Sequence, residues 1–388
     1  MYAVVHEDAE HIRMCQTARN FGRAVVVQRS LEAWFLREWQ RNSPWQILLR
    51  PLSWLFTVMA ATRAVLYRIG ILRVQRVAAM VIVVGNITVG GTGKTPLVLA
   101  IVAILARAGI RCGVVTRGYA AAAAPSHDNV QPVTPESQTP GTTSDEAMLL
   151  ANRSSVPVYA SVNRVAAAQT LLADHPEIDV IVCDDGLQHY ALGRDIEICV
   201  VDGARRFGNG GRLPAGPLRE SPSRLRAVDA IVVNRTGSHA TSARGEAASL
   251  ATQSYSMTLG NEVFLSLAGG DIFSAEEMRR QFNGKRIHAV AGIGNPPRFF
   301  AHLSRLGFVL AAATAFPDHH PFSRADFANI DADIILMTDK DAVKCRQFAD
   351  ARMWLMQVDA LMPAAFGEFL VNRVAALKVQ HVARSKTA

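Results

Sequence analysis

The chain has 388 residues, of which 49% are apolar, so it can bury one large core or two smaller ones and is not a disordered protein. Its formal net charge of +8 is mostly local, which weakens the case for a nucleic-acid partner. The five cysteines occur singly, without a C-x-x-C pair, so neither a zinc site nor a disulfide framework is indicated, and a reducing cytosol fits best.

Residues 1–36 are charge-balanced and lack the basic start and long apolar core of a signal peptide, so no function is assigned to this extension. Residues 37–79 form a basic apolar arm. From 37 to 76 the only acidic residue is Glu38, and the arginines are Arg37, Arg41, Arg50, Arg63, Arg68, Arg73 and Arg76.

The apolar, tryptophan-containing segment of this arm is residues 43–72. Its longest uncharged run, 51–62, is shorter than the roughly 20 residues that span a bilayer. We therefore expect a helix that lies on an anionic membrane surface, with apolar side chains at the acyl boundary and guanidinium groups on the headgroups. An ordinary helix buried against the rest of the protein is the alternative.

From Met80 onward, short apolar runs alternate with helical segments, which predicts an α/β fold with a doubly wound parallel sheet over residues 80–258. The expected strands end near residues 85, 117, 160, 185, 202 and 234, and helices are expected over 95–109 and 163–175. Residues 120–143 are predicted to form a long surface loop or flap.

A polar stretch from about 235 to 260 marks a boundary, and residues 259–388 are predicted to form a second, smaller α/β domain. Its expected strands cover residues 285–293, 308–316, 332–338 and 353–358, and its expected helices cover 296–307 and 362–377.

The segment GNITVGGTGKTP, residues 85–96, follows the first apolar run and resembles a P-loop, although Thr88 occupies the position of the first glycine. Its glycines allow successive backbone N–H groups to surround a phosphate. Lys94 supplies a positive charge, and Thr95 offers a hydroxyl group to Mg²⁺. A glycine-rich strand-to-helix connection that binds nothing is the alternative.

An acidic pair, Asp184 and Asp185, ends the apolar run of residues 179–185. A nucleoside triphosphate site needs a carboxylate of this kind at the end of a neighbouring strand to hold Mg²⁺, which typically takes one or two carboxylates from the protein. Alternatively, the two aspartates cap the next turn.

Three further segments are candidates for substrate handling. In residues 142–150, Thr143 and Glu146 have the spacing of a capping box, and Asp145 at the helix start could also accept a proton. Residues 316–322 contain Asp318, His319 and His320, which can equally form a polar turn. Residues 205–220 form an arginine-containing loop suited to an anionic substrate.

Taken together, VIVVGNITVGGTGKTP, RGYA, DDGLQHY, RRFGNG, LPAGPLRE, AGIGNPPRFF and MTDKDAVKCR resemble the tetraacyldisaccharide 4′-kinase family, and only residues 1 to about 36 lie outside the likeness. The resemblance implies transfer of the γ-phosphate of ATP to the 4′-hydroxyl of a tetraacyldisaccharide 1-phosphate, giving lipid IVA in lipid A biosynthesis. It also implies a P-loop fold, Mg²⁺ dependence and a membrane-associated N-terminal helix at the cytoplasmic face of the bacterial inner membrane. No nucleic-acid or protein partner is implied.

The resemblance also assigns roles to residues. Asp145 would be the catalytic base, His319 would assist it, and Arg117, Tyr119 and Arg219 would contact the substrate. Thr95, Asp184 and Asp185 would hold the metal, with Lys94 acting in catalysis. The implied ATP-binding residues are Thr88, Val89, Gly90, Gly91, Thr92, Gly93, Lys94 and Thr95. The chain departs from the family at SDEA and RGYAA, where the family has GDEP and RGYGG.

Two other classes of protein remain open. A P-loop switch or ATPase acting on a protein partner would share the nucleotide site, but the N-K-x-D motif of guanine-specific proteins is missing, since VVNRTG at 232–237 lacks the acidic residue. A non-enzymatic membrane or nucleic-acid binding module is the third class, and salt-sensitive DNA binding would favour it.

Overall fold

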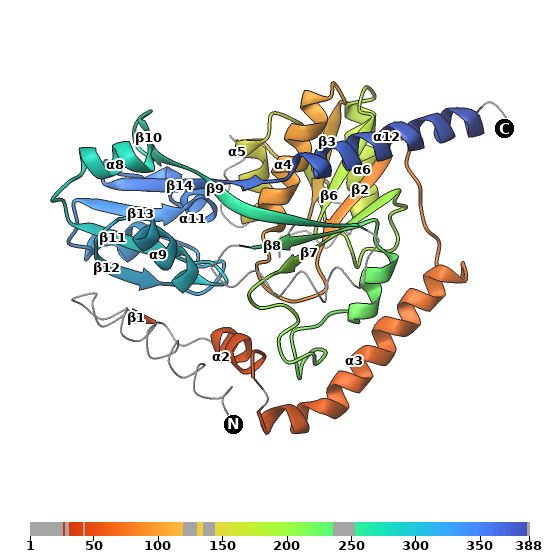
Figure 1. Cartoon of the computed structure of the whole chain (residues 1–388), viewed down its shortest axis with the longest axis horizontal. Coiled ribbons are helices and arrows are strands. Elements are labelled where there is room, and N and C mark those ends of the chain that lie inside the picture. Colours follow the sequence, from red (N-terminus) through yellow and green to blue (C-terminus); the bar gives the residue numbers. More distant parts are fainter. Residues whose placement is uncertain are drawn as a thin grey trace. The chain divides into compact units, whose positions relative to one another are not determined.

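The structure is a computed structural model, and it describes residues 26–27, 31–41, 43–118, 130–134, 144–235 and 253–385. The chain divides into two compact units, which are described separately (Figure 1). Unit 2 comprises Trp34–Gly260 and Asp359–Ala388, and unit 1 comprises Asn261–Val358 with the N-terminal residues up to Ala33.

Unit 2 is built on a mainly parallel sheet with the strand order β9-β8-β7-β2-β6-β3-β5-β4. The strands are β2 (Met80–Gly85), β3 (Cys112–Thr116), β4 (Gln131–Pro132), β5 (Val158–Ala160), β6 (Val180–Asp184), β7 (Ile196–Asp202), β8 (Ala230–Asn234) and β9 (Ser254–Ser266), which continues into unit 1. At one edge of this sheet, β4 runs antiparallel to its neighbour, β5. Every residue of β2, β3, β6 and β8 is buried, as expected of parallel strands covered on both faces, and the predicted strands are confirmed.

Helices cover both faces of this sheet. Helix α4 (Lys94–Arg107) contacts β2, β3 and β6, and it also packs against α5 (Asp145–Arg153) and α12 (Ala364–Ser385). Helix α6 (Arg164–Asp174) belongs to a different core cluster, in which Val165 and Leu171 pack with Val81 and Val83 of β2. A short 3₁₀ helix, η1 (Pro222–Ala227), precedes β8. The predicted mixed α/β fold with a large parallel sheet is thus present.

Unit 1 has a smaller sheet with the strand order β1-β12-β11-β13-β14, and β10 pairs with β9. These strands are β1 (Val26–Val27), β10 (Ile272–Ser274), β11 (Ile287–Ala291), β12 (Leu310–Ala315), β13 (Ile334–Thr338) and β14 (Met353–Leu361). Helix α9 (Pro296–Arg305) packs in one core cluster with α8 (Ala275–Gln281). Helices α10 (Arg324–Ala328) and α11 (Asp339–Cys345), followed by η2 (Arg346–Phe348), pack in another. The expected strands and the helix at 296–307 are confirmed.

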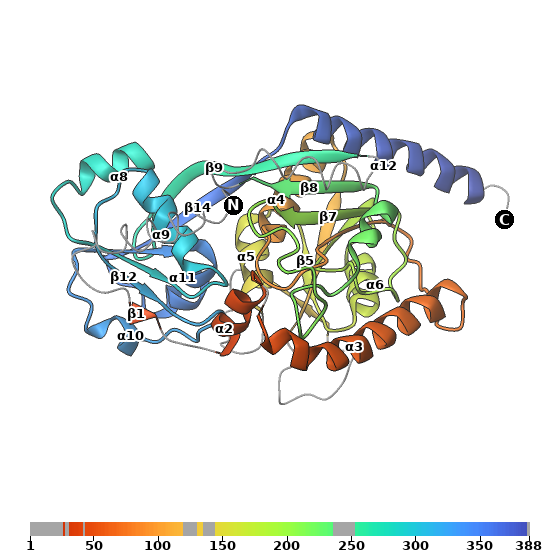
Figure 2. The same cartoon turned by 60° about the horizontal axis from the view of Figure 1, so that its bottom comes forward.

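The basic arm contains α2 (Leu31–Glu38) and the long helix α3 (Trp45–Arg68), which is labelled in Figures 1 and 2. Ser53 is the one buried residue of α3, whereas Leu48 and Trp54 are 71% and 70% exposed. The alternative of an ordinary buried helix is therefore wrong. In the part of the chain that the structure describes, no helix is both long and apolar enough to cross a membrane.

Three local expectations differ from the structure. The N-cap of α5 is Ser144, whose Oγ accepts a hydrogen bond from the Ala147 N–H. The predicted capping box of Thr143 with Glu146 is therefore wrong, because the N-cap lies one residue later. Strand β9 begins inside the polar stretch expected to be a boundary. Residues 359–388 group with unit 2 because α12 packs on α4, whereas the predicted C-terminal domain includes them. The domain limits 37–79, 80–258 and 259–388 stay predictions.

Candidate active site

The loop after β2 forms one side of the candidate site. β2 ends at Gly85 and α4 begins at Lys94, so the residues predicted to bind ATP, Thr88 to Thr95, lie between a buried strand and the first turn of a helix. Gly90 and Gly93 have φ angles of 95° and 94°, which residues with a side chain rarely adopt. Because the N-cap residue Gly93 has no side chain, it cannot bond the first amides of α4, and these amides suit an anion.

Two asparagines brace this loop. The amide nitrogen of Asn86 donates to Thr92 Oγ1 at 3.2 Å, and its amide oxygen accepts a hydrogen bond from Lys94 Nζ at 3.2 Å. Asn234, at the end of β8, donates to the Thr92 carbonyl at 3.0 Å. A Cβ atom at Gly93 would lie 2.6 Å from the Asn234 amide nitrogen, so this close approach requires glycine.

The predicted metal-binding aspartates lie beside this loop because β6 is the parallel neighbour of β2, with Asp184 paired in register with Val84. Asp184 is the last residue of β6 and is buried. Asp185 follows with a φ of 48°, and its carboxylate lies 3.3 Å from Lys94 Nζ and 3.5 Å from Arg219 Nη1. The structure therefore brings Lys94, Arg219 and the acidic pair together.

The two carboxyl groups differ electrostatically. Burial, together with the charge of Asp185, raises the pKa of Asp184 to about 7. Burial also opposes ionisation of Asp185, but the charges of Lys94 and Arg219 hold its pKa below the ordinary value. One carboxyl group is thus an easily protonated, buried acid, and the other is a firmly ionised partner of two cations.

The surroundings of Asp184 fit a divalent cation. Its Oδ2 accepts a hydrogen bond from Thr116 Oγ1 at 3.4 Å, whereas Oδ1 is buried and has no hydrogen-bond partner among the described residues. A buried, unpartnered carboxylate oxygen is costly unless a ligand completes it. Among these residues no cluster of three or more His, Cys, Asp or Glu side chains could hold a metal, but Mg²⁺ needs only one or two carboxylates with phosphate and water. Thr95, in the first turn of α4, is the predicted hydroxyl ligand.

The start of α5 forms another side of the site. Asp145 is its first residue and is partly buried. The preceding Ser144 donates its hydroxyl to the Arg117 carbonyl at 2.8 Å, which joins this helix to the end of β3. The charge of Glu146 contributes to the raised pKa of Asp184. Arg117 itself adjoins Thr116, whose hydroxyl donates to Asp184, so the start of α5 is joined to the acidic pair through the end of β3. Tyr119 lies outside the described residues.

Arg219 ends a glycine-rich loop that runs along the P-loop. Its backbone N–H donates to the Ile87 carbonyl at 2.7 Å, and the N–H of Val89 donates to the Pro217 carbonyl at 2.9 Å. An isolated bridge joins Thr88 to the residue between them, Leu218. The predicted substrate loop and the predicted ATP loop therefore share backbone hydrogen bonds.

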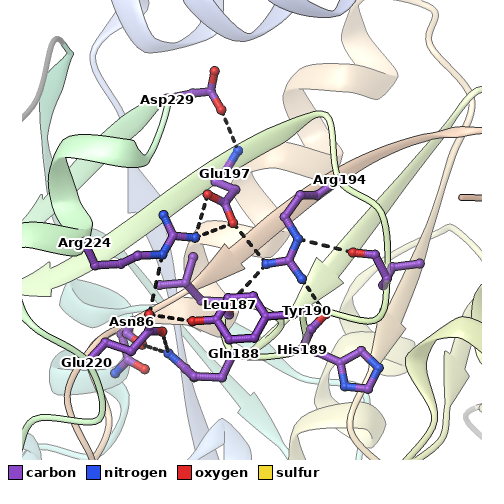
Figure 3. Close-up of polar contacts among 11 residues, drawn as sticks. Asn86, Leu187, Gln188, His189, Tyr190, Arg194, Glu197, Glu220, Arg224 and Asp229 are labelled. Atoms are coloured by element: carbon purple, nitrogen blue, oxygen red, sulfur yellow. Dashed lines mark hydrogen bonds and ion pairs between the residues drawn. The ribbon is translucent and has the colours of Figure 1, made fainter. Parts of the chain in front are cut away.

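The next residue, Glu220, belongs to a polar network beside the site (Figure 3). Gln188 donates to Glu220 Oε1 at 2.7 Å and to the Asn86 carbonyl at 3.0 Å, and the Tyr190 hydroxyl donates to Glu220 Oε2 at 2.8 Å. The network continues through Arg194, Glu197, Arg224 and Asp229. These contacts fix the segment after Asp185 relative to the start of the P-loop.

The glycine-rich loop is also joined to the arm. Ser53 Oγ donates to the Arg212 carbonyl at 3.0 Å and accepts a hydrogen bond from the Ala215 N–H at 3.0 Å. Trp39 Nε1 donates to the Pro214 carbonyl at 2.9 Å. The one buried residue of α3 is thus its attachment to the loop.

His319 belongs to unit 1 and Asp145 to unit 2, so their joint role stays a prediction. His319 has a φ of 60°, and its side chain is 38% exposed. Its neighbours in unit 1 include Asp318 and Lys340.

Sequence reasoning gave four residues no role in this site: Asn86, Glu146, Glu220 and Asn234. Asn86 and Asn234 follow or end predicted strands, so the rule that selected Asp184, a polar residue at the carboxyl end of a parallel strand, could have found them. Glu146 was considered only as a capping-box residue and Glu220 adjoins Arg219, and no further signal marks either of them as part of the site.

Comparison with known proteins gives concordant results. Residues 45–375 match the family described as Tetraacyldisaccharide-1-P 4′-kinase. A tetraacyldisaccharide 4′-kinase of Methylobacillus flagellatus is 42% identical over 357 residues, covering 91% of this chain and 99% of that protein. One of Herminiimonas arsenicoxydans is 44% identical over 367 residues, covering 90% and 98%.

A crystal structure of LpxK from Aquifex aeolicus in complex with ATP has the same fold, with a TM-score of 0.67 and 24% identity over 85% of this chain and 99% of that chain. The match to the family covers most of the chain, and the relatives are matched over nearly their full length. The chain therefore belongs to the tetraacyldisaccharide-1-P 4′-kinase family.

Proposed function

We propose that this protein transfers the γ-phosphate of ATP to the 4′-hydroxyl of a tetraacyldisaccharide 1-phosphate, forming the 1,4′-bisphosphate lipid IVA in lipid A biosynthesis. The observation that carries the proposal is the pairing of Lys94 with Asp185, 3.3 Å apart at the mouth of a P-loop, in a chain of this family. A lysine and a carboxylate facing each other across a P-loop are the elements that phosphoryl transfer requires.

ATP binds with its phosphates on the amides of residues 88–95. Lys94 then exchanges Asp185 for a phosphate oxygen, because both are anions competing for one ammonium group. The neighbouring Arg219 keeps Asp185 partly compensated during this exchange. Asn86 and Asn234 need not move, since they hold the loop through Thr92 and not through the phosphate-facing amides.

Mg²⁺ is the proposed cofactor: Asp184, Asp185 and Thr95 would hold it, and it would supply charge neutralisation on the transferred phosphate. The unpartnered Oδ1 of Asp184 supports this assignment. Bound Mg²⁺ favours the ionised carboxylate, so it offsets the burial that raises the pKa of Asp184.

In the reaction, the 4′-oxygen of the sugar forms a bond to the γ-phosphorus, the bond from that phosphorus to the β,γ-bridging oxygen breaks, and ADP leaves. Asp145 accepts the proton of the 4′-hydroxyl, with the assistance that the family resemblance assigns to His319. Arg117, Tyr119 and Arg219 contact the substrate. Positioning and charge neutralisation provide most of the rate enhancement.

The membrane surface is the second partner. The exposed apolar side chains of α3, with Arg50, Arg63 and Arg68 on the same helix, suit an anionic bilayer on which the acylated substrate is presented. We assign the protein to the cytoplasmic face of the bacterial inner membrane, as a peripheral or monotopic protein.

The function is tested by incubating the purified protein with radiolabelled ATP and the disaccharide 1-phosphate in detergent, followed by chromatography of the lipid. We expect label in the lipid and none with the Lys94→Ala variant. ATP hydrolysis stimulated by a protein, with no labelled lipid, would favour a P-loop switch instead.

The membrane assignment needs a separate measurement, sedimentation with anionic vesicles. The double variant Trp54→Ser, Leu55→Ser should bind at least about tenfold more weakly, since it removes two exposed apolar side chains. Val309→Ser is the matched control, because Val309 is 85% exposed but belongs to unit 1. Equal losses in both variants would contradict the assignment to α3.

A further inference from the structure

Two segments that resemble the family, AGIGNPPRFF and MTDKDAVKCR, have no role in the proposed reaction so far. Both lie in unit 1, where AGIGNPPRFF covers the end of β11 and the start of α9, and MTDKDAVKCR covers the end of β13 and α11. Because β11 and β13 are parallel neighbours, their carboxyl ends lie at one edge of the sheet. The loop that carries His319 leaves the same edge, after β12.

This loop is fixed at its base but presents His319 at its tip. The Phe316 N–H donates to the Ala291 carbonyl at 2.8 Å, which attaches the loop to the end of β11. The His320 ring packs between Phe316 and Phe322, with ring centroids 4.6 and 4.8 Å away. His320 is therefore part of the hydrophobic packing, and His319 is the histidine directed to the more exposed side.

Two lysines of α11 hold the loop from the side. Lys340 Nζ lies 3.1 Å from Asp318 Oδ1 and 3.4 Å from His319 Nε2. Lys344 Nζ donates to the His320 carbonyl at 3.1 Å and lies 5.3 Å from the centre of the Phe322 ring. Residues four apart lie on one face of a helix, so both lysines face the same loop.

Helix α11 is itself held firmly. Asp341 accepts hydrogen bonds from Thr338 Oγ1 at 2.7 Å and from the Gly292 N–H at 2.9 Å, which joins the first turn of α11 to the loop after β11. Asp341 is completely buried. The two unassigned segments therefore form one support, and Lys340 is the side chain through which it contacts His319.

We propose that Lys340 is a positioning residue for His319, which it orients by donating a hydrogen bond to the ring Nε2 while Asp318 fixes the ammonium group. An ammonium group has only protons to offer, so the ring nitrogen facing it must be the unprotonated one. The neutral ring then carries its proton on Nδ1 and presents that N–H as a donor. This inference rests on the proposed function, in which His319 assists the catalytic base.

The opposing contact is weaker. Asp318 Oδ2 lies 3.9 Å from His319 Nε2, beyond hydrogen-bond distance, whereas Asp318 Oδ1 accepts hydrogen bonds from Lys340 and from the His319 backbone N–H, the latter at 3.1 Å. Asp318 is thus engaged with Lys340 and the backbone. Of these two contacts to Nε2, the one with Lys340 is the hydrogen bond that orients the ring.

The experiment measures the ring nitrogens directly. The full-length protein is labelled with ¹⁵N-histidine, and the His319 signals are identified by their loss in His319→Gln. In the wild type, Nε2 should show the shift of an unprotonated nitrogen and Nδ1 that of a protonated one. In Lys340→Met the two shifts should move towards each other as the tautomers mix, and in Lys340→Arg they should stay near the wild-type values.

Activity provides the second measurement. Lys340→Met should lower kcat by about 10- to 100-fold, as is usual when a residue that orients a functional histidine is lost, while KM for ATP stays unchanged. Lys285→Met is the matched control, because Lys285 is an exposed lysine of the same unit, and it should change neither measurement. Thermal unfolding of both variants shows whether a loss of kcat merely reports unfolding.

The nitrogen shifts and kcat together decide between the positioning role of Lys340 and its alternatives. If the wild type is active and the His319 nitrogen shifts are the same in Lys340→Met, the positioning role is overturned. It is also overturned if the shifts change in Lys340→Met while kcat does not. A wild type that phosphorylates no lipid overturns the proposed function whatever the spectra show. Shifts and kcat that change together in Lys340→Met, and recover in Lys340→Arg, establish the positioning role.

Discussion

Two aspartates are almost completely buried, Asp184 at the carboxyl end of β6 in unit 2 and Asp341 in the first turn of α11 in unit 1, but the hydrogen bonding of their carboxylate oxygens differs. Both oxygens of Asp341 have partners, since Oδ2 accepts two hydrogen bonds and Oδ1 lies 3.5 Å from Lys344 Nζ. One oxygen of Asp184 has no hydrogen-bond partner among the described residues. A buried carboxylate whose two oxygens both have polar partners in the protein supports the fold. A buried carboxylate with one oxygen that lacks such a partner indicates a ligand at that oxygen.

The strongest test of this contrast is Asp184→Asn. We expect kcat/KM for lipid phosphorylation to fall about 1000-fold, because the variant lacks one of the carboxylates that we propose as ligands of Mg²⁺. The thermal midpoint of the metal-free protein should stay unchanged or rise, since a buried carboxyl group is replaced by a neutral amide of similar size. A large loss of stability with kcat/KM retained would reverse the distinction between the two aspartates.

Asp341→Ala should instead lower the stability of the fold. It leaves the Gly292 N–H, the Thr338 hydroxyl and the Lys344 ammonium group without their common acceptor, and breaking such a buried pair costs about 3 kcal/mol or more. We expect a lower midpoint in chemical denaturation of the metal-free protein. Asp339→Ala on the same helix is the control, and a similar loss in both variants would contradict the special role of Asp341.

The pH dependence of stability sharpens the contrast further. The pKa of Asp184 is about 7 in the folded chain, above its unfolded value, so the folded state binds the proton more tightly. Between pH about 4 and about 7 this group therefore makes the metal-free protein less stable as the pH rises, by at most about 1.4 kcal/mol per pH unit.

Asp184→Asn should abolish this contribution, so the difference in unfolding free energy between wild type and variant should change across that range. A difference that is flat with pH would refute the raised pKa. Added Mg²⁺ should reduce the slope in the wild type, since the ion favours the ionised carboxylate.

The smallest expected effect concerns the link between the arm and the site. Ser53→Ala removes the side chain that bonds the Arg212 carbonyl and the Ala215 N–H, at a cost of about 1 kcal/mol. Hydrogen exchange of the Ala215 amide should accelerate, whereas Thr62→Ala, at an exposed position of the same helix, should leave it unchanged. Unaltered exchange in Ser53→Ala would mean that the arm does not hold the loop.

Much of the fold and part of the site could be predicted from the sequence because the information is local. The apolar run from Met80, the glycine-rich turn and Lys94 adjoin one another, so strand, phosphate loop and helix are recognisable in order. The alternation of runs and helical segments predicted the parallel sheet, which placed Asp184 and Asp185 at its carboxyl edge. The motifs in sequence then identified the family.

The remaining features depend on strand order and packing, which no local pattern contains. Asn234 reaches the P-loop because β8 lies two strands away from β2, on the side of β7. Lys94 pairs with Asp185, which follows the strand with a positive φ, and no local pattern in the sequence predicts this backbone conformation. Helix α12 joins unit 2 through contacts with α4.

The hydrogen bonds of Trp39 and Ser53 have a practical consequence for anyone who wishes to shorten the protein. Deleting the first 68 residues to improve handling in aqueous buffer would remove three hydrogen bonds from the 212–215 backbone, and the same loop forms hydrogen bonds with Ile87 and Val89 beside the predicted ATP-binding turn. Such a deletion would alter the proposed nucleotide site as well as the arm that we propose to bind the membrane, so a shortened protein that fails to turn over would reveal nothing about whether the bilayer itself is needed.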